Sequence, residues 1–203
     1  MLQISTVTPN TLELLKRLQS MPELAETRLV GGTALAFHLG HRLSIDLDLF
    51  GAFDNATITE TLQSETFDDF LIFSESKVIK RYQINKVKVD IVKYDRYQWL
   101  EEAVMENNIR VAGLKDIAAM KVAAITNRGT KKDFIDMFFL LQLFKIQEIV
   151  EFYQTKYFDA NLYCAVMSLG YFEDAEKDEM PKMLIPTNWN DVKKRISAAV
   201  KEL

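Results

Sequence analysis

Hydrophobic and polar residues alternate over residues 43–49, within a predicted strand at 43–50, a pattern typical of a β-strand with one buried face. Ile45, Leu47 and Leu49 are expected to point into the core. The opposite side, extended by one residue, carries polar side chains only: Arg42, Ser44, Asp46 and Asp48. Residues two apart along a strand are separated by about 6.6 Å. The two carboxylates are therefore expected to lie next to each other, where a divalent cation would compensate their repulsion.

A second apolar run, residues 28–30, predicts a strand that enters the pair Gly31-Gly32. Glycines at this point let the backbone approach a ligand closely, and the N-terminus of a following helix offers free N–H groups to a phosphate. That helix is expected over residues 33–39 and ends at Gly40.

The remaining pattern predicts an α+β protein. Four further strands are expected, at 70–74, 78–84, 87–94 and 109–112. The hairpin between the middle two turns over Asn85-Lys86. Apolar residues three and four positions apart predict helices at 9–20, 57–64, 114–127, 131–141, 146–157, 160–169 and 189–200. We therefore expect a mixed sheet flanked by helices over residues 1–110, followed by a helical region over 111–203 that packs on it.

Composition narrows the class of protein. Of the 203 residues, 48% are hydrophobic and 27% are charged, as in ordinary globular proteins. The net charge of −4 argues against wholesale non-specific binding of nucleic acid. The single cysteine, Cys164, excludes an internal disulfide and fits a reducing compartment. The longest apolar run, residues 137–141, is far too short to cross a bilayer, so a soluble cytoplasmic protein is expected.

The glycine pair and the aspartates together form a motif. Gly-Gly-Thr at 31–33 is followed, after twelve residues, by Asp-Leu-Asp at 46–48. This arrangement resembles the signature of the polymerase-β-like nucleotidyltransferases. The longer string over residues 31–50, which includes Gly-His-Arg-Leu-Ser at 40–44, resembles the AbiEii/AbiGii nucleotidyltransferase toxins of type IV toxin–antitoxin pairs.

The resemblance implies a nucleotidyltransferase fold and the transfer of a nucleoside monophosphate from an NTP to an acceptor hydroxyl. Asp46 and Asp48 would bind Mg²⁺, or Mn²⁺ in its place. The residues expected to hold phosphate are Gly31, Gly32, Thr33 and Lys121. Arg42 and Ser44 would support the phosphates or orient the carboxylates. The acceptor would be a tRNA end, and the protein a toxin with a cognate antitoxin protein as its partner.

Asp90 has two interpretations. Aspartate is depleted from strand interiors, yet Asp90 lies within the strongly β-forming run 87–94. The nucleotidyltransferase resemblance implies a third carboxylate on a strand next to the Asp-Leu-Asp strand, and Asp90 is the candidate, as metal ligand or base. The alternative is an edge-strand residue that balances Lys88.

Lys121 and Asp136 form a second pair of candidates. Each lies within an apolar helical segment, and a buried charge needs a partner. In one interpretation they form a buried ion pair that joins two helices. In the other, Lys121 meets the phosphates, while Asp136 positions the lysine or touches the nucleotide. The AbiEii-like family carries a Lys…Asp-x-x-Asp pattern that Lys121, Asp133 and Asp136 match, although Asp133 is also typical of a helix N-terminus.

Several other hypotheses remain open on the sequence. The chain could transfer a nucleotide to a protein or to a small molecule such as an aminoglycoside, bind nucleotide without turnover, or act as an interaction partner. Basic residues at 77–96, and the group Arg128, Lys131 and Lys132, are solvated faces in one interpretation and contacts to triphosphate or RNA in the other. His38 and His41 are expected to be helix-end or packing residues, because neither has another ligand at metal-binding spacing.

Overall fold

A seven-stranded mixed sheet forms the centre of the protein, whose computed structural model describes residues 1–203. The strand order is β3-β4-β5-β2-β1-β7-β6. The strands are β1 (Arg28–Val30), β2 (Leu47–Gly51), β3 (Phe70–Glu75), β4 (Ile79–Ile84), β5 (Val87–Lys93), β6 (Val104–Glu106) and β7 (Ile109–Val111). The pairs β2–β5 and β1–β7 are parallel, and the other neighbours are antiparallel.

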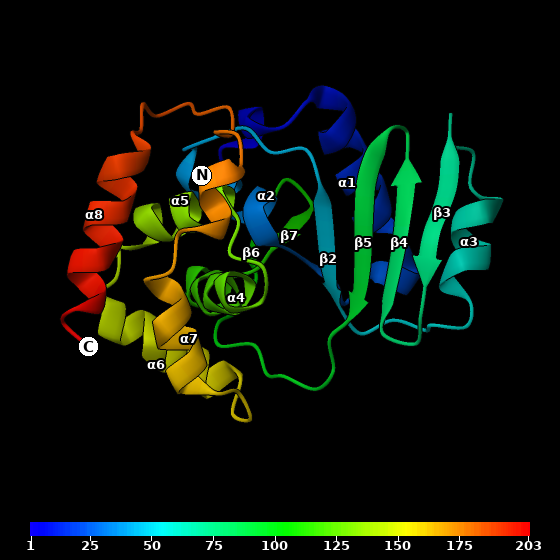
Figure 1. The fold of residues 1–203 in the computed structure, drawn as a ribbon. Helices are drawn as coiled ribbons and strands as arrows, with labels where there is room; N and C mark the ends of the chain where they lie inside the picture. The colour runs from blue at the N-terminus through cyan, green and yellow to red at the C-terminus, as the bar shows by residue number, and fades with distance from the viewer.

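Eight α-helices accompany the sheet. Those within the first part of the chain are α1 (Pro9–Ser20), α2 (Gly31–Leu39) and α3 (Ile58–Ser64). Those after the last strand are α4 (Leu114–Asn127), α5 (Lys131–Leu140), α6 (Ile146–Lys156), α7 (Leu162–Leu169) and α8 (Trp189–Val200). Figure 1 shows α4–α8 gathered on one side of the molecule, with α2 and α4 next to the sheet and α8 farthest from it. None of the helices has the length and apolar character needed to span a membrane.

The two faces of the sheet have different neighbours. Leu47, Leu49 and Val89 point to one face and are fully buried there. Tyr82 lies opposite Val89 on that face, and its hydroxyl hydrogen-bonds to Thr59 of α3. The other face carries Asp48 and Asp90 and faces the helical region (Figure 1). The carboxylates of Asp48 and Asp90 therefore lie between the sheet and α4.

Most predicted elements are confirmed. The structure has the mixed α/β architecture of the prediction, and α1, α4 and α8 have the predicted bounds. Thr8 caps α1 by accepting a hydrogen bond from the Thr11 N–H. Asn85 and Lys86 both have positive φ angles, as a two-residue turn between right-twisted strands requires.

Strand β2 begins later than its alternation predicts. The sequence pattern starts at residue 43, but the ladder starts at Leu47, and Ile45 is 66% exposed instead of buried. The residues before the ladder take their backbone partners outside the sheet. The Leu43 N–H donates to the Lys182 carbonyl, and the Ser44 N–H donates to the Thr6 carbonyl. Asp46 therefore lies just before the strand and outside its ladder.

Three smaller predictions were wrong. Strand β6 was missed, although Asn107 and Asn108 adopt positive φ angles and turn it tightly into β7. Helix α2 starts at Gly31 and not at residue 33. Helix α7 starts at Leu162 and not at residue 160, because the Asn161 side chain accepts from the N–H of residue 164 and caps it there.

Candidate active site

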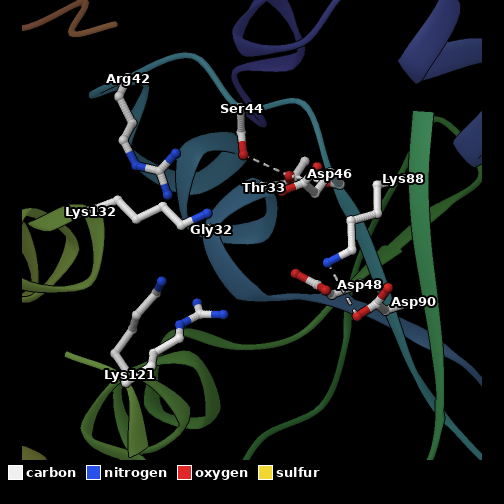
Figure 2. Close-up of a pocket in the computed structure, with 11 residues that line it drawn as sticks. Gly32, Thr33, Arg42, Ser44, Asp46, Asp48, Lys88, Asp90, Lys121 and Lys132 are labelled. Carbon is white, nitrogen blue, oxygen red and sulfur yellow. Dashed lines mark hydrogen bonds and ion pairs between the residues drawn. The ribbon is translucent and has the colours of Figure 1, made fainter. Parts of the chain in front are cut away.

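The sheet register places the acidic residues in one row. Val30 of β1 lies opposite Asp48 of β2, which lies opposite Asp90 of β5, and Arg81 of β4 follows next. Because β2 and β5 are adjacent and parallel, Asp48 and Asp90 project from the same face at neighbouring positions. Figure 2 shows their carboxylates close together, with the Lys88 amino group beside them. The sheet thus brings together two aspartates that are 42 positions apart in sequence.

These carboxylates open into a polar cavity of about 90 Å³ that no hydrophobic residue lines. Its wall consists of Gly32, Thr33, Arg42, Ser44, Asp46, Asp48, Lys88, Asp90, Lys121, Arg128 and Lys132. Figure 2 shows the acidic groups on the strand side and Arg42, Lys121 and Lys132 on the opposite side. The sequence-predicted residues therefore share one cavity, with the exceptions of Gly31, Asp133 and Asp136. Gly31 lies behind Asp48 and lines an adjoining cavity.

Asp48 lies in the most anionic part of this cavity. Its burial, followed by the charges of Asp90 and Asp46, raises its pKa to about 6. Lys121 and Lys88 oppose that shift but do not cancel it. Burial and the neighbouring carboxylates therefore both disfavour the charged form of Asp48, and a bound cation would favour it.

The carboxylate of Asp90 also lacks a full set of partners within the protein. One of its carboxylate oxygens, Oδ2, lies 3.3 Å from Arg81 Nε and 3.5 Å from Lys88 Nζ. The other, Oδ1, is buried and has no hydrogen-bond partner. A buried acceptor without a partner is uncommon, and it fits an oxygen that binds a ligand. The alternative role of Asp90 on a sheet edge does not apply, because β5 lies between β4 and β2.

The donor set suits Mg²⁺ in one specific way. No group of three or more His, Cys, Asp or Glu side chains is arranged to hold a metal ion by itself, so the predicted three-aspartate ligand set is not preformed. Mg²⁺ usually takes one or two carboxylates together with substrate phosphates and water, not a cage made by protein alone. Asp48 and Asp90, with Asp46 on the same wall, match that kind of site, and Mn²⁺ fits the same donors.

The glycine pair is required by the two side chains beside it. Gly31 has a φ of +70°, and a Cβ built there would lie 2.4 Å from Asp48 Oδ2. A Cβ on Gly32 would lie 2.2 Å from Arg42 Nη2. The glycines thus let a carboxylate and a guanidinium pack directly against the first turn of α2, whose free N–H groups are at the cavity.

Gly31→Ala is therefore expected to destabilise the protein. Both the left-handed backbone and the contact with Asp48 oppose a side chain, and the backbone effect alone costs about 1–2 kcal/mol. Urea unfolding would measure it. Gly170→Ala is the matched control, since its φ is −95° and its Cβ would meet nothing closer than 3.8 Å. Equal stabilities for the two variants would contradict this explanation of the glycine.

Lys121 bridges two aspartates of α5. Its Nζ lies 2.6 Å from Asp136 Oδ2 and 3.0 Å from Asp133 Oδ1, and the residue is 3% exposed. Burial alone would lower the pKa of Lys121, but Asp136 and Asp133 outweigh it and the pKa is raised. The predicted ion pair between the helices is present, and the lysine also lines the cavity, so the two interpretations are compatible.

Asp136 is placed behind the cavity wall. It is fully buried and lines none of the cavity. Arg42 donates to it from Nε at 2.7 Å and from Nη2 at 2.8 Å, and His41 Nε2 lies 2.8 Å from Oδ1. Together with the ion pair to Lys121, these contacts give both carboxylate oxygens of Asp136 a partner. Asp136 therefore has no direct contact with the cavity, and its carboxylate holds Arg42 and Lys121, which line it.

Asp133 has more partners than its place in the first turn of α5 predicts. Arg128 donates to it from Nε and Nη2, at 2.9 and 3.1 Å, and the Thr130 hydroxyl donates at 2.6 Å. Thr130, which precedes the first residue of α5, makes no side-chain hydrogen bond to the helix backbone. Asp133 instead holds Arg128 and Lys121, both of which line the cavity.

Acid is expected to release this network. Burial alone would raise the pKa of Asp136, but Lys121 and Arg42 hold it well below its ordinary value. Because the pKa is depressed in the folded state, the stabilisation is complete above the unfolded pKa of about 4 and is lost as pH falls below it, at up to about 1.4 kcal/mol per pH unit. The unfolding free energy of wild type should therefore fall more steeply below pH 4 than that of Asp136→Asn. Parallel curves would contradict it.

Four cavity or support residues were not singled out as site residues from the sequence. Lys88, Arg128 and Lys132 belonged to basic groups that had two interpretations, and all three line the cavity. His41 was expected to be a packing residue, and it contacts both Phe139 and Asp136. The contact between Arg128 and Asp133 depends on how α4 and α5 meet, which the sequence pattern does not show.

The sequence of the chain matches one protein family and one relative of similar length. Residues 13–202 match the family described as nucleotidyl transferase AbiEii toxin, type IV TA system. An uncharacterized protein of Aquifex aeolicus (strain VF5) is 34% identical over 198 residues, covering 94% of each chain.

Solved structures share the fold. JHP933 from Helicobacter pylori has a TM-score of 0.61 at 17% identity, covering 97% of this chain and 92% of its own. MenT4, a nucleotidyltransferase toxin from Mycobacterium tuberculosis H37Rv, has a TM-score of 0.53 at 16% identity, covering 94% and 81%. The family match spans nearly the whole chain and includes every residue of the cavity. This protein belongs to the AbiEii nucleotidyltransferase toxin family and is a nucleotidyltransferase.

Proposed function

We propose that the protein transfers a nucleoside monophosphate from an NTP to an acceptor hydroxyl and releases pyrophosphate, with Mg²⁺ or Mn²⁺ held by Asp46, Asp48 and Asp90. The observation that carries this proposal is the cavity itself, in which Asp48 and the unpartnered Asp90 oxygen lie across from a set of cations. Carboxylates facing cations suit a metal–triphosphate complex, whose metal and phosphates carry opposite charges.

The proposed role of each residue follows from its position around the cavity. A metal bound at the carboxylates supplies charge neutralisation for the phosphates and an alignment of attacking and leaving oxygens. The N–H groups at Gly31, Gly32 and Thr33 would hold phosphate oxygens at the start of α2. Lys121 would bind a phosphate from the opposite side, since Asp133 and Asp136 fix its amino group at the cavity wall.

Arg42 and Ser44 would act in support. The guanidinium of Arg42 is fixed by Asp136 and lies against Gly32, where it adds positive charge to the phosphate site. The hydroxyls of Ser44 and Thr33 are 2.8 Å apart, and Thr33 also hydrogen-bonds to the Asp46 carbonyl oxygen. These contacts would fix the segment before β2 that carries Asp46.

Asp90 would be the base or a metal ligand. Its free Oδ1 would accept the proton of an attacking hydroxyl, or coordinate the metal beside Asp48. Under this proposal, residues 1–110 form the nucleotidyltransferase core, and residues 111–203 form the helical region that closes the cleft with Lys121.

The acceptor and the partner follow from the family. We propose a tRNA end as acceptor. The exposed side chain of Arg128, with Lys132 beside it, would face the acceptor's phosphates. The family's type IV toxin–antitoxin system implies a cognate antitoxin as partner and a nucleotide as substrate.

A transfer assay tests the proposal. The protein would be incubated with each α-³²P-labelled NTP, Mg²⁺ and total RNA, and the products resolved on denaturing gels. Label in tRNA is expected. Label in protein, or in an added aminoglycoside, would replace the proposed acceptor, and nucleotide binding without any transfer would overturn the catalytic proposal. EDTA should abolish transfer, and added Mg²⁺ or Mn²⁺ should restore it.

A further inference from the structure

Lys88 is the one cation lining the polar cavity that pairs with an aspartate on its strand side. Its Nζ lies 3.5 Å from Asp90 Oδ2, and its side chain is 48% exposed. Figure 2 shows the amino group beside the carboxylates of both Asp48 and Asp90. The carboxylates proposed to bind the metal therefore already have a positive charge of the protein's own next to them.

The sheet register places Lys88 at this point. Lys88 precedes Asp90 by two residues on β5, so both side chains project from the same face, about 6.6 Å apart along the strand. Its neighbour across the sheet on β4 is Gln83, whose amide donates to Asp69. Asp90 is therefore the carboxylate with which Lys88 pairs.

The contact between Lys88 and Asp90 is loose. A distance of 3.5 Å is longer than the length of about 2.7–2.9 Å that is typical of a hydrogen bond between an ammonium group and a carboxylate. Ion pairs between exposed side chains contribute little to stability, and a lysine side chain is a flexible stem that carries a compact charge. Lys88 can therefore leave Asp90 without disturbing the fold.

Three other cations of the cavity are held from behind. Arg42, Lys121 and Arg128 pair with carboxylates of α5 that do not line the cavity. The contacts that hold these three side chains are therefore independent of what binds at Asp48. Lys88 differs from them, because its partner is itself a proposed metal ligand, and a metal bound there repels its amino group.

We infer that Lys88 is an exchangeable counter-ion, which neutralises the Asp48–Asp90 pair until a metal–NTP complex binds and then pairs with the triphosphate. The inference rests on the proposed function. Neutralisation of the carboxylates then comes from the metal, and the phosphates give Lys88 a new partner within the cavity that it already lines. Lys88 thereby couples the two ligands: it weakens the binding of metal alone and strengthens the binding of nucleotide together with metal.

Two dissociation constants of Lys88→Met test the inference. The Kd of Mn²⁺ alone is obtained from the electron paramagnetic resonance signal of free Mn²⁺. The Kd of nucleotide is obtained by calorimetry at saturating Mn²⁺, with the α,β-methylene analogues of ATP, GTP, CTP and UTP. Lys86→Met is the matched control, because Lys86 is exposed on the same hairpin and does not line the cavity. Lys132→Met is the control for charge alone, because Lys132 lines the cavity on the side opposite the aspartates.

In Lys88→Met, the Kd of Mn²⁺ alone is expected to fall about tenfold, while the Kd of the analogue that wild type binds rises about fivefold. Both constants should stay at their wild-type values in Lys86→Met. A folding defect would weaken both kinds of binding, so opposite shifts identify the exchange. Lys88→Gln is the second variant if the methionine lowers the melting temperature.

A Kd of Mn²⁺ that does not fall in Lys88→Met, or that falls equally in Lys132→Met, would overturn the inference. Analogue binding that fails to weaken in Lys88→Met would overturn it as well. If Asp48→Asn nevertheless abolishes the binding of Mn²⁺ with the analogue, the proposed function stands. Wild type that binds no Mn²⁺, even in the presence of the analogues, would overturn both.

Discussion

Asp48→Asn is expected to lower the rate of nucleotidyl transfer by about a thousandfold without loss of stability. A metal bound at the carboxylates contributes several kcal/mol to the transition state, and each 1.36 kcal/mol corresponds to a factor of ten. The fold should tolerate the change, because burial, followed by repulsion from Asp90 and Asp46, already raises the pKa of Asp48 to about 6. Removing its charge relieves that repulsion.

The measurements are the initial rate of label transfer and the melting temperature. Asp95→Asn is the matched control, since Asp95 is also acidic and follows β5, but its side chain is 60% exposed and pairs only with Lys93. We expect normal transfer from Asp95→Asn. A folded Asp48→Asn variant that transfers at the wild-type rate would remove Asp48 from the catalytic site.

Asp136→Asn is expected to be the most destabilising single change among the acidic residues discussed here. It leaves Arg42 and Lys121, both buried, without a charged partner at this position. Removing one member of a buried ion pair costs about 3–5 kcal/mol, because the remaining charge stays desolvated. Transfer by the folded fraction should fall as well, since Arg42 and Lys121 lose the carboxylate that holds them at the cavity.

Urea unfolding and single-turnover transfer would separate the two effects. Asp68→Asn is the control for stability, because Asp68 is exposed and its side chain makes no hydrogen bond. Its effect should stay within about 0.5 kcal/mol. If Asp136→Asn unfolds at the urea concentration of Asp68→Asn, Asp136 is not the centre of a buried network.

The two predictions together distinguish a carboxylate that lines the cavity, Asp48, from one that is enclosed by the protein, Asp136. Asp48 lines the cavity and its charged form is disfavoured there, so its loss should affect rate and spare stability. Asp136 is enclosed by Arg42, Lys121 and His41, so its loss should affect stability first. Both are aspartates within apolar segments, and the sequence alone gives them similar weight.

The sequence pattern alone was sufficient where the feature is local to one segment, such as a motif or the spacing of buried side chains along a helix. The Gly-Gly-Thr and Asp-Leu-Asp motif identified the family, and the spacing of apolar residues predicted α4 at its observed bounds. The positive charge of Lys121 within an apolar helix predicted a buried anionic partner, and the structure supplies two. Burial of a charge is costly in any fold, so this inference needed no tertiary information.

The sequence pattern failed where the structure of a segment depends on hydrogen bonds to another part of the chain. Ile45 continues the alternation of β2, yet the backbone before Leu47 bonds to Thr6 and Lys182 instead of to a neighbouring strand. Strand β6 is only three residues long, and its pairing with β7 gives it its identity. Neither partner can be found from the periodicity of the segment itself.

The sequence by itself therefore determined the class of fold, the nucleotidyltransferase motif and the need of Lys121 and Asp136 for partners. Only the tertiary structure decided that Asp90 stands beside Asp48, that Asp136 lies behind the cavity, and that Arg128 and Lys132 reach into it. The physical reason is that side-chain periodicity records only which face of an element is buried. Which strands pair, in what register, and which helices meet depend on hydrogen bonds and packing between segments far apart in the chain.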